Sequence, residues 1–290
     1  MHNRFNMTEK ELIHNLIRLA FAEDIGDGDH TTLCSIPATE EGQSKLLIKE
    51  EGILAGVDVA KEVFHDFDPQ LRVEVFLGDG SYVKPGDIAF IVSGKVRSIL
   101  QTERLVLNIM QRMSGVATIT HRYMELLKGT SAKVLDTRKT TPGMRILEKQ
   151  AVKIGGGENH RIGLFDMILL KDNHVDFAGG IENAIHGAQQ YLKEKNKNLR
   201  IEIEVRNSRE LEEVLRIGGG DRIMLDNFTP AQTLEAVRTV KAVNSRVELE
   251  SSGGITFDTI REYAETGVDY ISVGALTHSV KSLDMSLKAI

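Results

Sequence analysis

The sequence predicts an α/β protein with a small N-terminal α+β domain and a C-terminal (β/α) barrel, complete or incomplete. A short helix signal, an acidic glycine loop and several strand-like runs with turn signals occupy the first 95 residues. A long helical pattern follows at residues 97–128, and strands alternate with helices from residue 129 onwards. Such alternation is typical of parallel strands joined by crossover helices, and an open doubly wound sheet is the structural alternative.

The N-terminal domain is predicted from one helix, one loop and three strands. A helix is expected at residues 9–21, and an acidic glycine loop at residues 23–32. This loop faintly resembles a calcium-binding loop, but it lacks the later bidentate glutamate, so calcium is not expected. Turn signals such as Gly78-Asp79-Gly80 separate the strand-like runs. These runs are residues 45–48, 73–77 and 88–92.

Residues 97–128 carry one apolar stripe at helical spacing. The stripe consists of Ile99, Val106, Ile109, Met110, Met113, Val116 and Ala117. Arg104 lies off the stripe, and Gly115 predicts a kink or a close contact. We expect this helix to connect the two domains.

Six strands and four helices are expected after Gly129. The strands are residues 133–136, 167–170, 200–205, 222–225, 246–249 and 270–273. The helices are residues 182–195, 208–216, 229–243 and 257–266.

A charged, hydroxyl or glycine residue lies at the end of each predicted strand. Barrel enzymes place their catalytic groups at the C-terminal strand ends, so these residues are expected to share one mouth. They are Asp136 with Arg138 and Lys139, then Lys171, Glu204, Asp226, Ser251 with Ser252, and Gly274.

The predicted site has a cationic half and an acidic half. The cations suit several carboxylates or phosphates, because arginine pairs bidentately with planar anions. Glu204 and Asp226 suit Mg²⁺, which prefers oxygen ligands, and glycine turns can cradle a phosphate. The cations are Arg138, Lys139, His160, Arg161 and Lys171, and the turns are Ser252-Gly253-Gly254 and Val273-Gly274-Ala275. Together they predict a site for a dianionic acid and a magnesium-bound phosphorylated sugar.

Each of these groups also has a purely structural interpretation. Arg138 and Lys139 could form a solvated loop, and Lys171 could extend its amine from a buried strand into solvent. Glu202 and Glu204 share one face of their strand, which is either the barrel interior or an ordinary surface. Gly155-Gly156-Gly157 is expected to be a flexible loop that closes over a ligand.

Several motifs resemble the quinolinate phosphoribosyltransferase family. They occur in the same order along nearly the whole chain. They are residues 136–143 (DTRKTTPG), 155–161 (GGGENHR), 169–174 (LLKDNH), 224–228 (MLDNF), 250–255 (ESSGGI) and 272–278 (SVGALTH), with Glu23-Asp24 and Glu103-Arg104 before them. The Gly218-Gly219-Gly220 turn is longer than the usual family turn. A molybdenum-transport-associated relative is the alternative within this resemblance.

The resemblance implies transfer of phosphoribosyl from phosphoribosyl pyrophosphate to quinolinate, with decarboxylation. It implies that Arg138, His160, Arg161 and Lys171 hold the quinolinate carboxylates, with Arg104 from a neighbouring subunit of a homodimer or a multiple of dimers. Lys139 and Thr137 would lie at the substrates, and Glu204 and Asp226 at magnesium and ribose. The implied 5′-phosphate site is Ser252, Gly253, Gly254, Gly274 and Ala275.

The resemblance also implies the architecture, an N-terminal α/β sandwich followed by an open (β/α) barrel. The expected divisions are residues 1–115 for the sandwich with the connecting helix and residues 116–275 for the barrel. Residues 276–290 would form a C-terminal segment that packs back on the N-terminal domain.

Composition restricts partners and compartment. The net charge of −6 argues against nucleic acid and anionic membranes as partners. Cys34 is the only cysteine, so no internal disulfide is expected, and a buried thiol is predicted. Residues 1–10 lack an apolar signal core, and no apolar run approaches the ~20 residues that span a bilayer. We therefore expect a cytoplasmic protein.

Three rival functions remain at this point. A nicotinate phosphoribosyltransferase would need fewer cations, because nicotinate has one carboxylate. A barrel lyase would use Lys171 to form a Schiff base. A non-enzymatic phosphate-binding regulator would not need acids, cations and glycine turns together.

Overall fold

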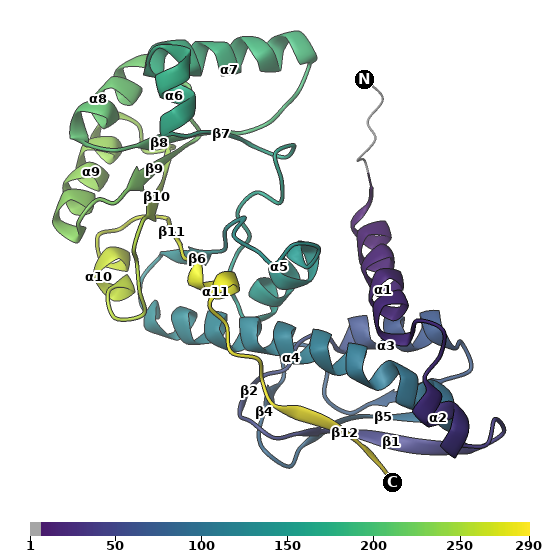
Figure 1. Cartoon of the computed structure of the whole chain (residues 1–290). Coiled ribbons are helices and arrows are strands. Elements are labelled where there is room, and N and C mark those ends of the chain that lie inside the picture. Colours follow the sequence, from purple (N-terminus) through teal and green to yellow (C-terminus); the bar gives the residue numbers. More distant parts are fainter. Residues whose placement is uncertain (1–6) are drawn as a thin grey trace. The chain divides into compact units, whose positions relative to one another are not determined.

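The computed structural model describes residues 7–290, which divide into two compact units (Figure 1). The first unit comprises the chain up to residue 121 together with residues 140–156 and 276–290. The second comprises residues 122–139 and 157–275. The expectation about a signal core in residues 1–10 partly concerns positions 1–6, which lie outside the described residues.

An antiparallel sheet of order β12-β1-β5-β3 forms the centre of the first unit. Phe64 of α3 packs edge-on against Phe90 of β5, with ring centroids 5.9 Å apart. The strands are β1 (Glu41–Ile48), β3 (Arg72–Val75), β5 (Ile88–Lys95) and β12 (Met285–Ala289), beside the small pair β2 (Gly52–Ile53) and β4 (Tyr82–Val83). The helices are α1 (Glu9–Ile25), α2 (His30–Ser35), α3 (Val57–Phe67), α4 (Val96–Leu126) and α5 (Arg145–Ile154).

Two expectations for this region are wrong. The acidic loop is shorter than predicted, because α1 continues to Ile25 and α2 begins at His30, where the Asp29 side chain accepts the Thr32 backbone N–H. Cys34 is exposed rather than buried, because it lies on this short surface helix.

The long helix α4 carries its predicted apolar stripe inward, and every stripe residue is buried. Gly115 marks a close contact, because a β-carbon there would collide with the carbonyl oxygen of Lys281. Gly155, which caps α5, is likewise buried against the carbonyl of Ala117. The first of the three consecutive glycines therefore serves close packing rather than loop flexibility.

The second unit is built on six parallel strands in the order β6-β11-β10-β9-β8-β7. Because β6 and β7 lie at opposite edges, the sheet is open (Figure 1). The strands are β6 (Lys133–Leu135), β7 (Ile168–Leu170), β8 (Ile201–Val205), β9 (Arg222–Asp226), β10 (Glu248–Ser252) and β11 (Tyr270–Ser272). The helices are α6 (Asp172–Ala178), α7 (Ile181–Lys195), α8 (Ser208–Ile217), α9 (Pro230–Val243) and α10 (Ile260–Ala264), and α11 (Ala275–His278) follows β11. The predicted fold class is confirmed.

One predicted strand of the second unit is displaced by two to three residues, whereas the others differ by a single residue at one end. β10 begins at Glu248 instead of residue 246. The reason is a turn after α9, in which the side-chain oxygen of the capping residue Asn244 accepts the backbone N–H of Arg246. Ser251 and Ser252 are consequently the last residues of the strand rather than residues after it. Within residues 7–290, no helix combines the length and apolar character needed to cross a bilayer.

Candidate active site

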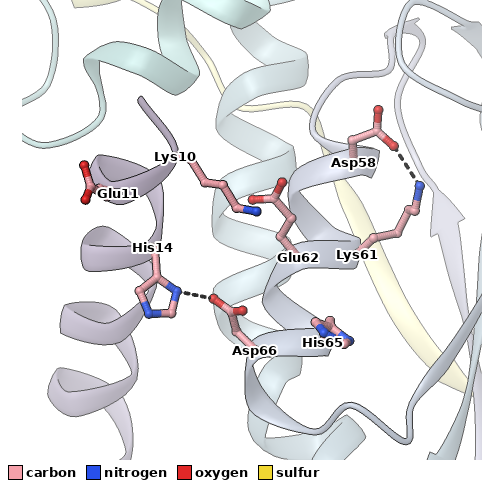
Figure 2. Close-up of a pocket in the computed structure, with 8 residues that line it drawn as sticks. All are labelled: Lys10, Glu11, His14, Asp58, Lys61, Glu62, His65 and Asp66. Atoms are coloured by element: carbon pink, nitrogen blue, oxygen red, sulfur yellow. Dashed lines mark hydrogen bonds and ion pairs between the residues drawn. The ribbon is translucent and has the colours of Figure 1, made fainter. Parts of the chain in front are cut away.

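The first unit contains a cleft of about 630 Å³ between α1 and α3 (Figure 2). Acidic side chains predominate in its lining, and two of them contact basic side chains of the same lining. His14 Nδ1 lies 2.7 Å from Asp66 Oδ2, and Lys61 Nζ lies 2.9 Å from Asp58 Oδ1. The lining residues are Lys10, Glu11, His14, Asp58, Lys61, Glu62, His65 and Asp66. Because acids outnumber lysines, this cleft does not suit an anionic ligand.

The second unit contains a smaller cleft, of about 200 Å³, at the C-terminal ends of its parallel strands. We call it the strand-end cleft. It collects eight of the residues that the sequence singled out, among them the strand-end residue Asp136 and seven others: Thr137, Arg138, Lys139, His160, Arg161, Lys171 and Ser252. Its other lining residues are Leu169, Met224, Glu250 and Ser272.

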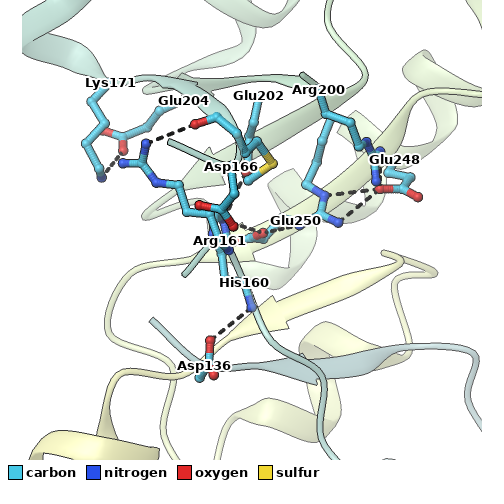
Figure 3. A network of polar contacts seen from close by, with 12 residues as sticks. Asp136, His160, Arg161, Asp166, Lys171, Arg200, Glu202, Glu204, Glu248 and Glu250 are labelled. Carbon is cyan, nitrogen blue, oxygen red and sulfur yellow. Dashed lines mark hydrogen bonds and ion pairs between the residues drawn. The ribbon is translucent and has the colours of Figure 1, made fainter. Parts of the chain in front are cut away.

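The loop that carries His160 is fixed beside β6. Glu158 pairs with the chain at Val134 and Asp136 through backbone hydrogen bonds of 2.8 and 3.2 Å. The buried Asp136 then accepts the backbone N–H of His160 at 2.9 Å (Figure 3). Asp136 thus links the end of β6 to the following cationic loop.

Arg161 and Arg138 bring two like charges into this cleft. Burial lowers the pKa of Arg161, and the neighbouring Arg138 charge lowers it further. Asp166 holds the segment after Arg161 by accepting the N–H groups of Ile162 and Gly163 at 2.8 and 2.9 Å. Two repelling guanidinium groups in one partly buried cleft are typical of a binding site for an anion.

Lys171 and Glu204 form an ion pair at the ends of β7 and β8, with Nζ 2.8 Å from Oε2. Lys171 stays about half exposed, whereas Glu204 is buried. Burial raises the pKa of Asp226 at the end of β9, and the neighbouring charge of Glu204 raises it further. Two mutually repelling carboxylates on adjacent strands fit the oxygen ligands of Mg²⁺.

The turn at Gly253 and Gly254 adopts a conformation that glycine takes most easily. Gly253 has φ +95°, and a β-carbon there would collide with the side chain of Asn227. Gly254 follows with φ +60°, while Gly274 and Ala275 lie between β11 and α11. Glycine residues therefore lie at the ends of two neighbouring strands, β10 and β11.

A buried polar cluster is formed by Glu202, Glu250 and Arg222, and Glu250 also lines the strand-end cleft. The sequence indicated only Glu202 of these three residues. Arg222 Nη1 lies 3.2 Å from Glu250 Oε2, and its ring-facing guanidinium stacks 4.1 Å from the Tyr270 centroid. Burial raises the pKa of Glu250 to about 7, and the charge of Glu202 contributes in the same direction. Burial also raises the pKa of Glu202. The alternation that placed Glu202 beside Glu204 was the available signal.

Arg104 belongs to the first unit, where it is exposed on α4. Its position off the apolar stripe is confirmed, and its participation in the site stays a prediction.

The second unit thus has the features of an α/β-barrel enzyme for anionic substrates, with cations, carboxylates and glycine turns at the strand ends. The comparisons with known proteins narrow this class. The family descriptions "Quinolinate phosphoribosyl transferase, N-terminal domain" and "C-terminal domain" match residues 29–114 and 116–288. The chain belongs to the quinolinate phosphoribosyl transferase family.

Similar proteins come from plants and bacteria. The Arabidopsis thaliana chloroplastic nicotinate-nucleotide pyrophosphorylase [carboxylating] is 46% identical, covering 94% of this chain and 81% of that protein. The probable nicotinate-nucleotide pyrophosphorylase of Bacillus subtilis is 40% identical, covering 95% and 92%. The crystal structure of NadC from Streptococcus pyogenes superposes with a TM-score of 0.89 at 37% identity, covering 98% of this chain and 99% of the other.

Proposed function

We propose that this chain transfers the phosphoribosyl group of phosphoribosyl pyrophosphate to quinolinate. The products are nicotinate mononucleotide, pyrophosphate and carbon dioxide, in a step of de novo NAD biosynthesis. The observation that carries this assignment is the convergence of Arg138, Arg161 and Lys171 on one strand-end cleft beside two carboxylates. Family membership supports the same reaction.

The cations of the cleft bind the two adjacent carboxylates of quinolinate. Guanidinium groups pair with planar carboxylates bidentately, which fixes the plane of the pyridine ring. A fixed ring directs the nitrogen lone pair at C1 of the ribose, and such orientation supplies much of the rate.

Bond formation between the pyridine nitrogen and C1 accompanies the departure of pyrophosphate. Lys139 is exposed at the rim of the cleft, where it can offset charge on the leaving group. Glu204 and Asp226 would hold Mg²⁺, which supplies Lewis-acid stabilisation of the pyrophosphate when bound. The turns at Ser252–Gly254 and Gly274–Ala275 would bind the 5′-phosphate through backbone N–H groups.

Decarboxylation follows from the charge that the transfer creates. The ring nitrogen becomes positive once it bonds to C1, and it can then accept the electron pair left as the adjacent carboxylate departs as carbon dioxide. A proton replaces the carboxylate, so the step needs neither an oxidant nor a covalent enzyme intermediate.

Assembly, location and domain division complete the proposal. We infer a homodimer or a multiple of dimers, with Arg104 entering the neighbouring subunit's site.

A domain boundary near residue 115 is supported by the matched family ranges, which end at residue 114 and resume at residue 116. Pairing of β12 with β1 supports a C-terminal segment that returns to the N-terminal domain. We keep the cytoplasm as the proposed compartment, although plant relatives are named chloroplastic or mitochondrial.

Nicotinate is the rival substrate. The crystal structure of human nicotinic acid phosphoribosyltransferase shares the fold, with a TM-score of 0.63 at 13% identity. The number of cations favours quinolinate, because a single carboxylate would leave part of this positive cleft uncompensated.

The test is an assay of purified protein with quinolinate, phosphoribosyl pyrophosphate and Mg²⁺ that counts carbon dioxide and nicotinate mononucleotide. A parallel reaction contains nicotinate instead. Product from quinolinate alone, abolished by a chelator, supports substrate, metal and reaction together. Absence of product from quinolinate contradicts the proposal.

A further inference from the structure

A buried ion pair in the first unit joins α4 to α5. Arg112 Nη2 lies 2.8 Å from Glu148 Oε1, and Arg112 Nε donates to the same oxygen at 3.0 Å. The Glu148 side chain is fully buried, whereas that of Arg112 is 22% exposed. A buried carboxylate is costly unless it is both paired and hydrogen-bonded. The arginine satisfies one carboxylate oxygen, and the second oxygen takes a donor from elsewhere in the chain.

That donor belongs to the loop before α5. Glu148 Oε2 accepts the backbone N–H of Thr141 at 3.1 Å. Thr140 is held as well, because its Oγ1 accepts Arg145 Nε at 3.0 Å. The chain enters the first unit at Thr140, directly after residues 137–139, which line the strand-end cleft. Helix α5 therefore fixes the chain at the end of the proposed quinolinate-binding segment.

Other donors of Arg112 hold a second segment. Nη2 donates to the carbonyl oxygen of Thr277 in α11, and Nη1 donates to that of Val280 at 3.5 Å. The chain returns to the first unit at Leu276, directly after residues 274–275, which form part of the proposed 5′-phosphate site. Arg112 therefore fixes the chain at the end of this phosphate turn.

We propose that Arg112 and Glu148 are positioning residues of the reaction, each acting through the backbone of one substrate-binding segment. Glu148 fixes Thr141 and thereby the segment that carries Arg138. Arg112 fixes Thr277 and thereby the phosphate turn. The inference rests on the proposed function, because it assigns quinolinate to the first segment and the 5′-phosphate to the second.

A purely stabilising ion pair is the alternative. A buried ion pair is weak evidence for stability, since well-packed apolar replacements are often neutral or stabilising. Loss of a purely stabilising pair would lower the amount of folded enzyme and leave the KM values of the remaining enzyme unchanged. Loss of a positioning contact moves a binding segment within the folded enzyme, and a displacement of about 1 Å can cost about 100-fold in rate. The two members of the pair should therefore affect different substrates.

Glu148→Gln tests the quinolinate-binding segment. The charge of Arg112 attracts the single amide oxygen, so the NH₂ group faces the Thr141 N–H and cannot accept it. We expect the KM for quinolinate to rise roughly 10- to 100-fold, while the KM for phosphoribosyl pyrophosphate stays within about threefold of wild type. Equal KM values for quinolinate in this variant and in wild type contradict the inference.

Arg112→Lys tests the phosphate turn. Lysine keeps a positive charge beside Glu148 but lacks the planar fork that also reaches the carbonyl groups of Thr277 and Val280. The KM for phosphoribosyl pyrophosphate should rise roughly tenfold or more, with a smaller change for quinolinate. A lower kcat with both KM values unchanged overturns the inference, because that result is expected of a purely stabilising pair.

Arg97→Lys is the matched control. Arg97 lies on the same helix and also donates to two backbone carbonyl oxygens, those of Ile36 at 2.8 Å and Leu33 at 3.2 Å. Because these carbonyl groups belong to neither substrate-binding segment, both KM values should stay within about twofold of wild type. Shifts as large as those of Arg112→Lys would contradict the inference.

Hydrogen exchange at the Thr141 amide, read by NMR of the full-length protein, tests the contact without turnover. We expect protection in wild type and exchange at least about tenfold faster in Glu148→Gln, with the amides of α9 unchanged. An unprotected Thr141 amide in wild type overturns the inference even if neither variant folds. If wild type turns over no quinolinate, the proposed function fails, while this amide still decides whether Glu148 holds the loop.

Discussion

Two of the clefts among residues 7–290 differ in size and in charge, and the smaller one is the better candidate site. The cleft between α1 and α3 has about 630 Å³, but its lining mixes acidic and basic side chains, including the contacts His14–Asp66 and Lys61–Asp58. The strand-end cleft has about 200 Å³ and gathers several cations. Burial lowers the pKa of Arg161 there, and the neighbouring charge of Arg138 lowers it further. Clustered like charge, more than volume, therefore identifies the cleft in which an anionic substrate is expected to bind.

The largest expected effect follows from removing one of the converging cations. Arg138→Ala or Lys171→Ala should lower kcat/KM for quinolinate roughly 100- to 1,000-fold, comparable to losing one preorganised charge-stabilising donor. The melting temperature should change little for Arg138→Ala, because its repulsion with Arg161 is relieved. It should fall modestly for Lys171→Ala, because the buried Glu204 loses its ion-pair partner. Near-normal turnover in either variant would remove the functional distinction between the clefts.

Substitution of a carboxylate in the acidic half of the site should have a smaller effect on the rate than loss of a cation. Asp226→Asn is expected to raise the Mg²⁺ concentration needed for half-maximal rate about tenfold, because it removes one of the two carboxylates that we propose as ligands of the ion. A magnesium titration of initial rates measures this shift. A matched substitution, Asp66→Asn in the α1–α3 cleft, should leave the titration curve unchanged.

Glu250 makes stability depend on pH. Its folded-state pKa is about 7 against an ordinary value of 4.5, because of burial. Between these values the folded protein holds a proton that the unfolded chain has released, so the free energy of unfolding falls as pH rises, by a total on the order of 3 kcal/mol. Glu250→Gln should flatten this slope in chemical denaturation between about pH 4.5 and 7. An unchanged slope would mean that Glu250 titrates normally.

Gly115 tests close packing in the first unit. Gly115→Ala should lower the free energy of unfolding by about 1–3 kcal/mol, because the new methyl group meets the Lys281 carbonyl. Gly187→Ala in α7 is the control, since a β-carbon there meets nothing within 4 Å. That variant should gain about 0.5–1 kcal/mol from helix propensity. Equal effects of both changes would contradict the contact.

The smallest effect is expected in the α1–α3 cleft. Lys61→Ala should leave kcat/KM within about twofold of wild type, because an exposed ion pair contributes little. A large loss of activity would show that this cleft takes part in function, and the contrast between the clefts would then need another basis.

The parallel sheet could be predicted from the sequence because its strands alternate regularly with helices. The positions of the cationic residues at the strand ends could be predicted from the same assignment of strands. Short elements without periodicity, such as β2, β4 and α6, carried no comparable signal. The extent of α1 past residue 21 and the exposure of Cys34 depended on where the following short helix begins.

The contacts of the His160 ring could not be predicted, because they involve groups that only folding brings together. Its ring lies against Glu202 of β8 and Glu250 of β10, while a backbone N–H from its own neighbour fixes the other nitrogen. A sequence motif identifies the residue but not whether its nitrogens face the ligand or the protein interior.

The most direct test of the central claim is calorimetric binding of quinolinate and nicotinate to wild type and to Arg138→Ala. If the converging cations select paired carboxylates, quinolinate should bind wild type at least about 30-fold more tightly than nicotinate, and Arg138→Ala should remove most of that preference. Equal affinity of wild type for the two acids would contradict the account.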